Sequence, residues 1–236
     1  MVATACFGRP AVSSDSPIHR RILNSIPFAL AARYACHSAM LAMALINETT
    51  RHPSLRDRVL EFVPRIEWVA ENNYRLWIAS YLPVAIVLWR VDRERFIRLQ
   101  YASCALSLLR GVCILATGLG PVDGVVGGPL TDVRSAWLGL VNPFQALFGK
   151  VAHVSLTQDL FFSGHTASTF VLYLYCRAAN RRVGYVALAA HVVVVASVFL
   201  AHLHYTIDVV GAWGVTFCVY GAIESLASRS AGGSVR

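Results

Sequence analysis

The chain carries few charged residues and almost no lysine. Only 14% of its 236 residues are charged, and Lys150 is the single lysine. Soluble domains typically contain about a quarter charged residues, so this deficit excludes the ordinary soluble class. The remaining composition, which is 56% hydrophobic with a mean hydropathy of +0.54, predicts an integral membrane protein.

Cysteine occurs six times, but never in a pair of the CxxC type. The six positions are scattered, mainly in apolar segments, and this supports neither a zinc site nor a disulfide framework. We therefore expect inert, buried thiols, and we predict neither a metal nor a cofactor. The sequence also lacks evident internal repeats and low-complexity tracts.

The charge balance is strongly basic, with a formal net charge of +8. In a soluble protein this excess would suggest a nucleic-acid partner. Here the basic residues lie mostly in short connectors between apolar runs, which is the pattern of the positive-inside rule for membrane proteins. We predict no nucleic-acid partner, and the sequence leaves a homo-oligomer open.

Six apolar runs are long enough to cross a membrane. They predict an all-α membrane protein with six transmembrane helices, arranged as a cytoplasmic tail over residues 1–24, a catalytic membrane domain over 25–226 and a flexible tail over 227–236. The expected spans cover roughly residues 26–46, 74–91, 99–119, 160–178, 183–201 and 205–225.

Six spans place both termini on one side of the membrane. The basic clusters at residues 20–21, 90–98 and 177–182 share that side, so the positive-inside rule makes both termini cytoplasmic. Two connectors, residues 47–73 and 120–158, then lie on the opposite face.

Within those connectors, two segments are predicted to rest on the membrane surface. Residues 60–69 are expected to form a short interfacial helix, and residues 143–150 an amphipathic segment. Two arginines lie inside apolar runs. Arg33 is expected to snorkel toward the basic side, whereas Arg110 lies at a depth where it needs a partner or water.

The last span begins with a histidine and an aspartate. His204 and Asp208 are four residues apart, which puts them on one helix face within hydrogen-bond reach. A carboxylate that accepts from one imidazole nitrogen fixes the tautomer and leaves the other nitrogen basic, as a nucleophilic histidine requires. Ionisable residues in a membrane span are costly, so this pair indicates function.

A second polar cluster begins the fourth span. Asp159 is followed by Ser163, Gly164, His165 and Thr166. Asp159 or Ser163 is expected to cap the helix, and Gly164 permits close backbone approach. The free N–H groups of such a helix start can bind an anion.

If adjacent spans run antiparallel, His165 and His204 return to the same membrane face. Arg110 in the third span is always charged and can bind a phosphate through two N–H groups. The sequence therefore predicts a phosphate site where two imidazoles, a carboxylate and an arginine meet.

These motifs resemble those of the sphingomyelin synthase family, which belongs with the type 2 phosphatidic acid phosphatase superfamily. The segment from Asp159 to Thr166 matches closely, and the segment from His204 to Val209 matches fully. Thr157, Gln158 and Trp213 stand where the family has cysteine, glycine and tyrosine.

The resemblance covers roughly residues 25–225 and is specific mainly over residues 159–213. Arg110 with Thr117 resembles the family's arginine–threonine pair in the third span. Residues 53–57 faintly echo its proline–aspartate element in the first outer loop.

The resemblance implies a phosphotransferase with a His–His–Asp triad and phospholipid and ceramide-like substrates. His204, oriented by Asp208, would attack the phosphorus of a phospho-head group such as phosphocholine and form a phosphohistidine. His165 would protonate the departing diacylglycerol and then deprotonate the hydroxyl of ceramide or a related lipid alcohol. The site would lie on the non-cytoplasmic face. The residues implied to bind substrate are Arg110, Asp159, Ser163, Gly164, Thr166 and Tyr205.

Three alternatives remain open. A lipid phosphate phosphatase or phospholipase C-like hydrolase would use water as the acceptor, but that branch usually begins its site with a lysine and an Arg-Pro pair, which the third span lacks. A transporter or scaffold would have to bring two histidines and an aspartate together by chance. A metal hydrolase would use His202, His204 and Asp208, and would be sensitive to chelators.

Overall fold

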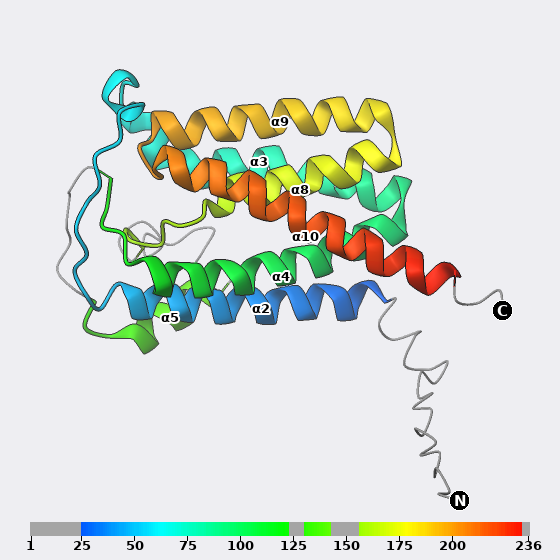
Figure 1. The fold of residues 1–236 in the computed structure, drawn as a ribbon, viewed down its shortest axis with the longest axis horizontal. Helices are drawn as coiled ribbons and strands as arrows, with labels where there is room; N and C mark the ends of the chain where they lie inside the picture. Colours follow the sequence, from blue (N-terminus) through cyan, green and yellow to red (C-terminus); the bar gives the residue numbers. More distant parts are fainter. Residues whose placement is uncertain (1–24, 123–129, 143–155, 233–236) are drawn as a thin grey trace, which may run out of the picture.

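The computed structural model describes residues 25–122, 130–142 and 156–232. Over these residues the chain forms seven α-helices, one short 3-10 helix and no strand, which confirms the predicted all-α class for the described part (Figure 1). The elements are α2 (Ile26–Asn47), η1 (Leu60–Phe62), α3 (Glu67–Val91), α4 (Arg93–Thr117), α5 (Val133–Val141), α8 (Gly164–Ala179), α9 (Arg181–Leu200) and α10 (Thr206–Gly232).

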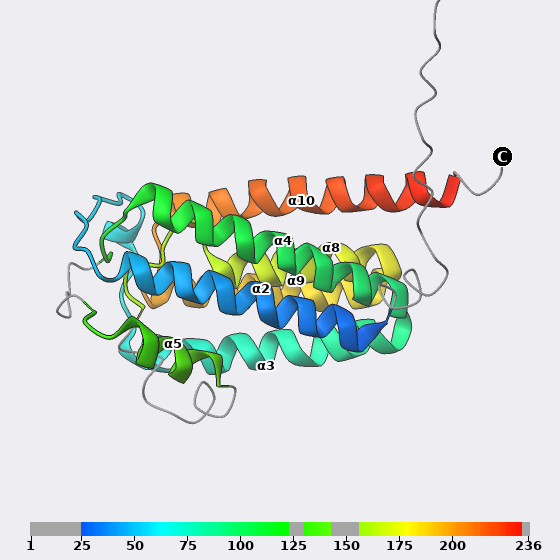
Figure 2. The same cartoon turned by 90° about the horizontal axis from the view of Figure 1, so that it is seen from below.

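The six long helices run along one common axis as a bundle, and the short helix α5 packs on α2 (Figures 1 and 2). Consecutive long helices run in opposite directions. The last turns of α2, α4 and α9 therefore lie at the same end as the first turns of α3, α8 and α10. We call this the site end, because the two predicted histidine clusters both lie there.

Helix α8 occupies the centre of the bundle, where it contacts α3, α4, α9 and α10. Its buried face carries Val171, Leu172, Tyr175 and Cys176, each at most 2% exposed. These positions follow the three- and four-residue spacing of a helix face that packs in a core. Burial on several sides holds the first turn of α8, and with it His165, in a defined position.

Four helical segments are long and apolar enough to cross a membrane: α2, α4, α9 and residues Thr206–Arg229 of α10. Length and composition thus support four of the six expected spans. Helices α3 and α8 pack among these four in the bundle. Their crossing of the membrane remains a prediction, as does the cytoplasmic position of both termini.

Several helices begin at other residues than expected. The main reason is that their first turns are polar, and a hydropathy pattern assigns polar residues to connectors. Helix α3 begins at Glu67 rather than at residue 74, and α4 begins at Arg93 rather than at residue 99. The Asp92 side chain caps α4 by accepting a hydrogen bond from the Arg95 N–H (3.0 Å). Helix α8 starts at Gly164 rather than at residue 160, because Ser163 is its cap.

Two expectations about the connectors and Arg33 are wrong. In place of the interfacial helix expected over residues 60–69, the structure has the single 3-10 turn η1, a non-helical stretch over 63–66 and the first residues of α3. Arg33 does not snorkel outward, because its Nη1 donates to Tyr81 Oη (2.7 Å) and Gln100 Oε1 (2.8 Å) on neighbouring helices. The amphipathic segment expected over residues 143–150 lies outside the described residues.

Candidate active site

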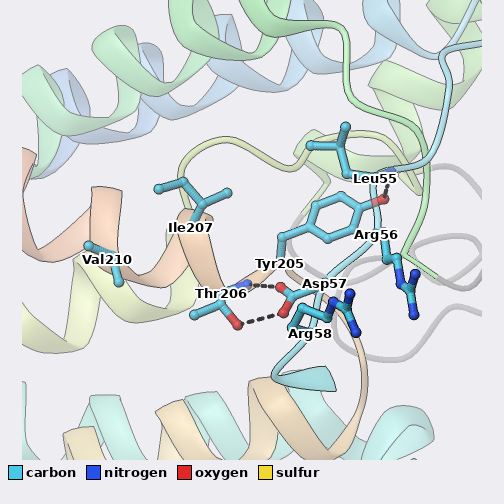
Figure 3. Close-up of a pocket in the computed structure, with 8 residues that line it drawn as sticks. All are labelled: Leu55, Arg56, Asp57, Arg58, Tyr205, Thr206, Ile207 and Val210. Carbon is cyan, nitrogen blue, oxygen red and sulfur yellow. Dashed lines mark hydrogen bonds between the residues drawn. The ribbon is translucent and has the colours of Figure 1, made fainter. Parts of the chain in front are cut away.

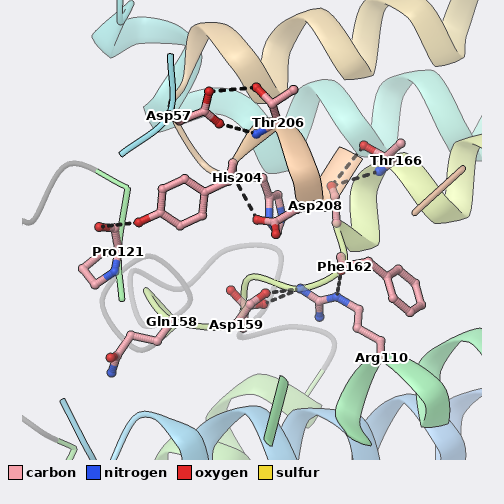
Figure 4. A network of polar contacts seen from close by, with 12 residues as sticks. Asp57, Arg110, Pro121, Gln158, Asp159, Phe162, Thr166, His204, Thr206 and Asp208 are labelled. Carbon is pink, nitrogen blue, oxygen red and sulfur yellow. Dashed lines mark hydrogen bonds and ion pairs between the residues drawn. The ribbon is translucent and has the colours of Figure 1, made fainter. Parts of the chain in front are cut away.

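The turn between α9 and α10 places His204 against Asp208. Asp208 is fully buried, and its Oδ2 accepts from the Tyr205 N–H (3.0 Å) and lies 3.3 Å from His204 Nδ1 (Figure 4). A carboxylate accepts only, so this contact assigns the proton of neutral His204 to Nδ1 and leaves a lone pair on Nε2. Among the described residues, Nε2 of His204 has no hydrogen-bond partner.

The start of α8 is tied directly to the first turn of α10. The Ser163 N–H donates to the Asp208 backbone carbonyl (3.1 Å). The Ser163 Oγ accepts from the N–H (3.4 Å) and the hydroxyl (3.0 Å) of Thr166, which confirms Ser163 as the helix cap (Figure 4). These bonds fix the two histidine-bearing turns relative to each other.

His165 follows this cap and lies beside the other predicted catalytic groups. It is close enough to His204, Arg110 and Asp159 to interact electrostatically with all three. Its ring meets the edge of Trp77 at 5.7 Å between centroids and is partly exposed. The structure thus brings His165, His204 and Asp208 together at the site end, as the sequence predicted.

Arg110 lies beneath these turns and is 6% exposed. Its Nε donates to the Phe162 carbonyl (2.7 Å), and its Nη2 donates to Asp159 Oδ2 (2.9 Å) (Figure 4). Its Nη1 donates to Met40 Sδ (3.2 Å), which is a weak acceptor, so this arm can turn to a stronger one such as phosphate. A Cβ at Gly164 would lie 3.2 Å from Arg110 Nε, which explains why glycine stands there.

Three residues predicted to bind substrate use their hydroxyl groups within the protein. Ser163 and Thr166 bond each other and are fully buried. The Tyr205 hydroxyl accepts from the Leu55 N–H (2.9 Å) and donates to the Gly120 carbonyl (2.9 Å). These contacts give all three residues a positioning role, and contact with substrate remains a prediction for them.

Asp57 is a contributor that the sequence argument left outside the site. Its carboxylate accepts from the Thr206 N–H (2.5 Å) and the Thr206 hydroxyl (3.0 Å), and so caps α10 from the first connector (Figure 4). Burial raises the pKa of Asp57, but hydrogen bonds from Thr206, Val59 and Leu60 outweigh it and hold the pKa below its usual range. The faint proline–aspartate resemblance over residues 53–57 was the signal for this residue.

Glu48, at the end of α2, holds the segment before Asp159. Its buried carboxylate accepts from the backbone N–H groups of Thr157 and Gln158, each at 2.5 Å. The Gln158 side chain in turn donates to the Thr50 carbonyl (3.0 Å). No sequence motif marked Glu48, which resembles any other charge in its connector.

The buried His191 connects Trp213 to the backbone of His165 through hydrogen bonds. Trp213 Nε1 donates to His191 Nε2 (2.9 Å), and His191 Nδ1 lies 2.8 Å from Thr169 Oγ1. An indole N–H only donates, so Nε2 accepts and the His191 proton lies on Nδ1. The Thr169 hydroxyl bonds the His165 carbonyl (2.9 Å), which completes a chain across α10, α9 and α8. Trp213, where the resembled family has tyrosine, is therefore the start of this chain.

Comparison with known families covers the same part of the chain. A family model described as PAP2 superfamily C-terminal matches residues 158–226. The match supports membership of the PAP2 superfamily. It spans Asp159, His165, His204 and Asp208, and it supports a membrane-bound lipid enzyme of the phosphatase or phosphotransferase type. No curated protein matches the chain.

A pocket of about 290 Å³ lies beside the candidate site, but on the other side of α10 (Figure 3). Thr206 and Val210 line it, and both lie on the helix face away from Asp208. It is therefore not the space in front of His204. Its remaining lining residues are Leu55, Arg56, Asp57, Arg58, Tyr205 and Ile207.

The metal-hydrolase alternative needs at least three ligands in one place. Within the part of the chain that the structure describes, no group of three or more His, Cys, Asp or Glu side chains could hold a metal ion. His202, one of the three proposed ligands, instead lies with its Nε2 2.9 Å from the Val63 carbonyl. These three residues therefore do not form a ligand set.

Proposed function

We propose that this protein is a phosphotransferase that moves a phospho-head group, such as phosphocholine, from a glycerophospholipid to ceramide or a related lipid alcohol. The observation that carries the proposal is the buried His204–Asp208 pair, in which Nδ1 faces the carboxylate and Nε2 has no partner among the described residues. This is how a carboxylate prepares an imidazole for nucleophilic attack.

In the first step, His204 Nε2 attacks the phosphorus, and the bond between phosphorus and the diacylglycerol oxygen breaks. Protonated His165 gives its proton to that oxygen, so diacylglycerol leaves as a neutral alcohol and the head group stays on His204. Arg110 Nη1, which has only the weak acceptor Met40 Sδ, and the N–H groups at the start of α8 would meet the negative charge on the phosphoryl oxygens.

In the second step, the acceptor alcohol reverses this chemistry. Neutral His165 takes the proton of the acceptor hydroxyl, whose oxygen attacks the phosphorus and displaces His204. His165 is then protonated again, and His204 is free for the next donor. Each proton transfer of this kind contributes about 10²–10⁴ in rate.

A hydrolase that uses water in the second step is the alternative. The buried position of the pair favours a lipid acceptor, because His204 is 4% exposed and Asp208 is fully buried. The single lysine, Lys150, also lies outside the third span, where the phosphatase branch carries one. Both observations support transfer over hydrolysis.

The test uses the purified full chain in detergent micelles with a head-group-labelled phospholipid, short-chain ceramide and EDTA. We expect the label to move to ceramide, and His204→Ala to abolish this transfer. Arg182→Gln, an exposed substitution far from the site end, is the matched control and should keep wild-type rates. Release of the free head group with no labelled ceramide would overturn the transferase in favour of the hydrolase. Loss of activity with EDTA that a divalent metal restores would favour the metal hydrolase.

We further propose that all six long helices cross the membrane and that the site faces the non-cytoplasmic side. Arg58 at the site end and Arg182 at the opposite end are both exposed, so each can be replaced by cysteine for labelling. In intact cells, an impermeant thiol reagent should label Arg58→Cys and spare Arg182→Cys, with the unsubstituted protein as background. The reverse pattern would overturn the orientation.

A further inference from the structure

Arg33 lies inside α2, one of the candidate membrane spans, and has no carboxylate partner among the described residues. Its two acceptors, Tyr81 Oη and Gln100 Oε1, are neutral, and its guanidinium group lies 5.3 Å from the centre of the Tyr81 ring. These contacts hold the cation in place without neutralising it. A charge in a membrane span is costly, so such a residue points to a function.

His37 lies one helical turn closer to the site end. It shares one face of α2 with Arg33, Met40, Leu41 and Ala44, at the spacing of a helix stripe that packs on its neighbours. Met40, Leu41 and Ala44 are buried on this face, yet His37 is exposed and Arg33 is partly exposed. Both basic residues therefore have side-chain surface that a ligand beside α2 can reach.

This level lies directly below the candidate site. Met40 contacts Arg110 through its sulfur, and His37 interacts electrostatically with both Arg33 and Arg110. Seven residues of α-helix separate Arg33 from Met40, a rise of about 10 Å. Arg33 is thus about two helical turns deeper in the bundle than Met40, the residue that touches Arg110, with His37 between them.

Helices α2 and α3, which carry Arg33 and Tyr81, pack mainly on other helices. Helix α2 packs mainly on α4 and α5, whereas α3 packs on α9, α8 and α4. The two helices lie apart in Figure 1, with other helices drawn between them. The bond from Arg33 to Tyr81 links α2 to α3 across this separation, and Trp77 of α3 extends the same side toward His165.

We propose that Arg33 and His37 bind the acyl carbonyl oxygens of the lipid donor, below the reacting phosphate. Arg33 offers only N–H donors, so its ligand must supply acceptors. A glycerophospholipid whose phosphate lies between Arg110 and His204 carries its ester carbonyl oxygens one glycerol unit deeper in the bilayer, where these side chains lie. The inference rests on the proposed function, since it requires a phospholipid at the His204 site.

The test compares two donors that share a labelled head group and chain length, one with two ester linkages and one with two ether linkages. The ether donor lacks both carbonyl oxygens. Wild-type protein should favour the diester by roughly tenfold in kcat/KM, the value of one hydrogen bond to a charged donor. Arg33→Gln and His37→Ala should slow turnover of the diester and leave that of the diether unchanged. The ratio of the two kcat/KM values should therefore fall toward one.

Two further variants separate binding from structure. Tyr81→Phe removes an acceptor of Arg33 but keeps the cation, and should keep the diester preference. Arg182→Gln, at the other end of the bundle, should also keep it. If Arg33→Gln and His37→Ala slow both donors by one factor, the two residues are only structural and the inference is overturned. Equal wild-type rates for the two donors would overturn this inference and leave the proposed function standing. No turnover of either donor would overturn the proposed function as well.

Discussion

The two ends of the helix bundle use their carboxylates in different ways. At the end opposite the site, carboxylates pair with arginine side chains. Arg98 bonds both Glu94 (2.7 Å) and Glu224 (2.9 Å), which ties α4 to α10. Asp92 likewise pairs with Arg95 within the first turn of α4. These carboxylates therefore each have an arginine side chain as a partner.

At the site end, Asp159 and Glu61 also pair with arginine side chains, but three other carboxylates bind the backbone. Glu48 accepts from two N–H groups before Asp159, and Asp57 accepts from the Thr206 N–H at the start of α10. Asp208 accepts from the Tyr205 N–H as well as facing His204. These acids position loops and helix starts, and the basic groups around them are left with few anionic partners.

This difference suggests how a membrane helix bundle can fix the geometry of an active site at one of its ends. Carboxylates that accept from backbone N–H groups fix the geometry of the site end without pairing with its arginines, and of the site arginine Arg110 only one arm is paired with a carboxylate. We therefore expect substitutions at the site end to change activity, and substitutions at the opposite end to change stability alone. Five predictions test this contrast.

The largest effects are expected from Asp208 and the two histidines, and Asp208→Asn is the most conservative of these substitutions. The amide has nearly the same shape but no charge, so it favours the wrong imidazole tautomer and no longer stabilises protonated His204. Head-group transfer should fall by about 10²–10⁴, with the protein still folded. The measurement is transfer of a labelled head group to short-chain ceramide, alongside thermal unfolding in the same detergent.

The two histidines sharpen this result. His204→Ala should abolish transfer, and His165→Ala should slow it strongly because the departing alcohol loses its acid. Groups that act as one unit are not additive, so the double variant should be little worse than either single one. Full activity in His204→Ala, or losses that multiply in the double variant, would contradict the shared mechanism.

Glu48→Gln is expected to have the next largest effect. The amide accepts less strongly than the carboxylate and adds N–H groups beside the Thr157 and Gln158 donors. Stability should fall by about 1–3 kcal/mol, the cost of an unsatisfied buried group, and transfer should fall because Asp159 and Arg110 lose their position. Glu61→Gln, in the same connector but paired with Arg56 at the surface, is the control. Equal losses in the two variants would remove the distinction between backbone and side-chain partners.

Much of this arrangement could be predicted from the sequence, because its signals are local. The periodic apolar runs predicted long helices, and the spacing of His204 and Asp208 predicted a contact that the structure contains. Ser163 was one of two predicted caps. Local signals fail where partners lie far apart in the chain, as for Glu48 with Thr157 or Trp213 with His191.

The helix starts show a second limit of the sequence argument. Glu67 and Arg93 begin helices, yet a hydropathy pattern assigns charged turns to connectors. Arg33 shows the same limit inside a span, since snorkelling is the general expectation for an arginine near a helix end. Only the three-dimensional packing reveals Tyr81 and Gln100 as its acceptors.

Asp57 gives a smaller effect that depends on pH. Its pKa is lower in the folded protein than in the unfolded chain, so its contribution to stability is present above the usual aspartate pKa of about 4 and is lost as pH falls through the folded value. At neutral pH, Asp57→Asn should destabilise by about 1 kcal/mol, as loss of a helix cap does. The difference from wild type should shrink as pH falls below about 4. Thermal unfolding at several pH values measures it, and a difference that grows at low pH would contradict the assignment.

The smallest effect on activity is expected from the ion pair between Arg98 and Glu224. Both side chains are partly exposed, at 22% and 28%, so water and salt screen the pair. A double-mutant cycle with Arg98→Gln and Glu224→Gln should give a coupling energy of about 0.2–1 kcal/mol, smaller at high salt. Transfer should stay within about twofold of wild type in all three variants, because they lie at the far end of α4 and α10 and no bond to His204 or Arg110 is lost. If any of them lowered transfer as much as Glu48→Gln, the two ends would be coupled through α10, and the division of the bundle into a reactive end and a structural end would fail.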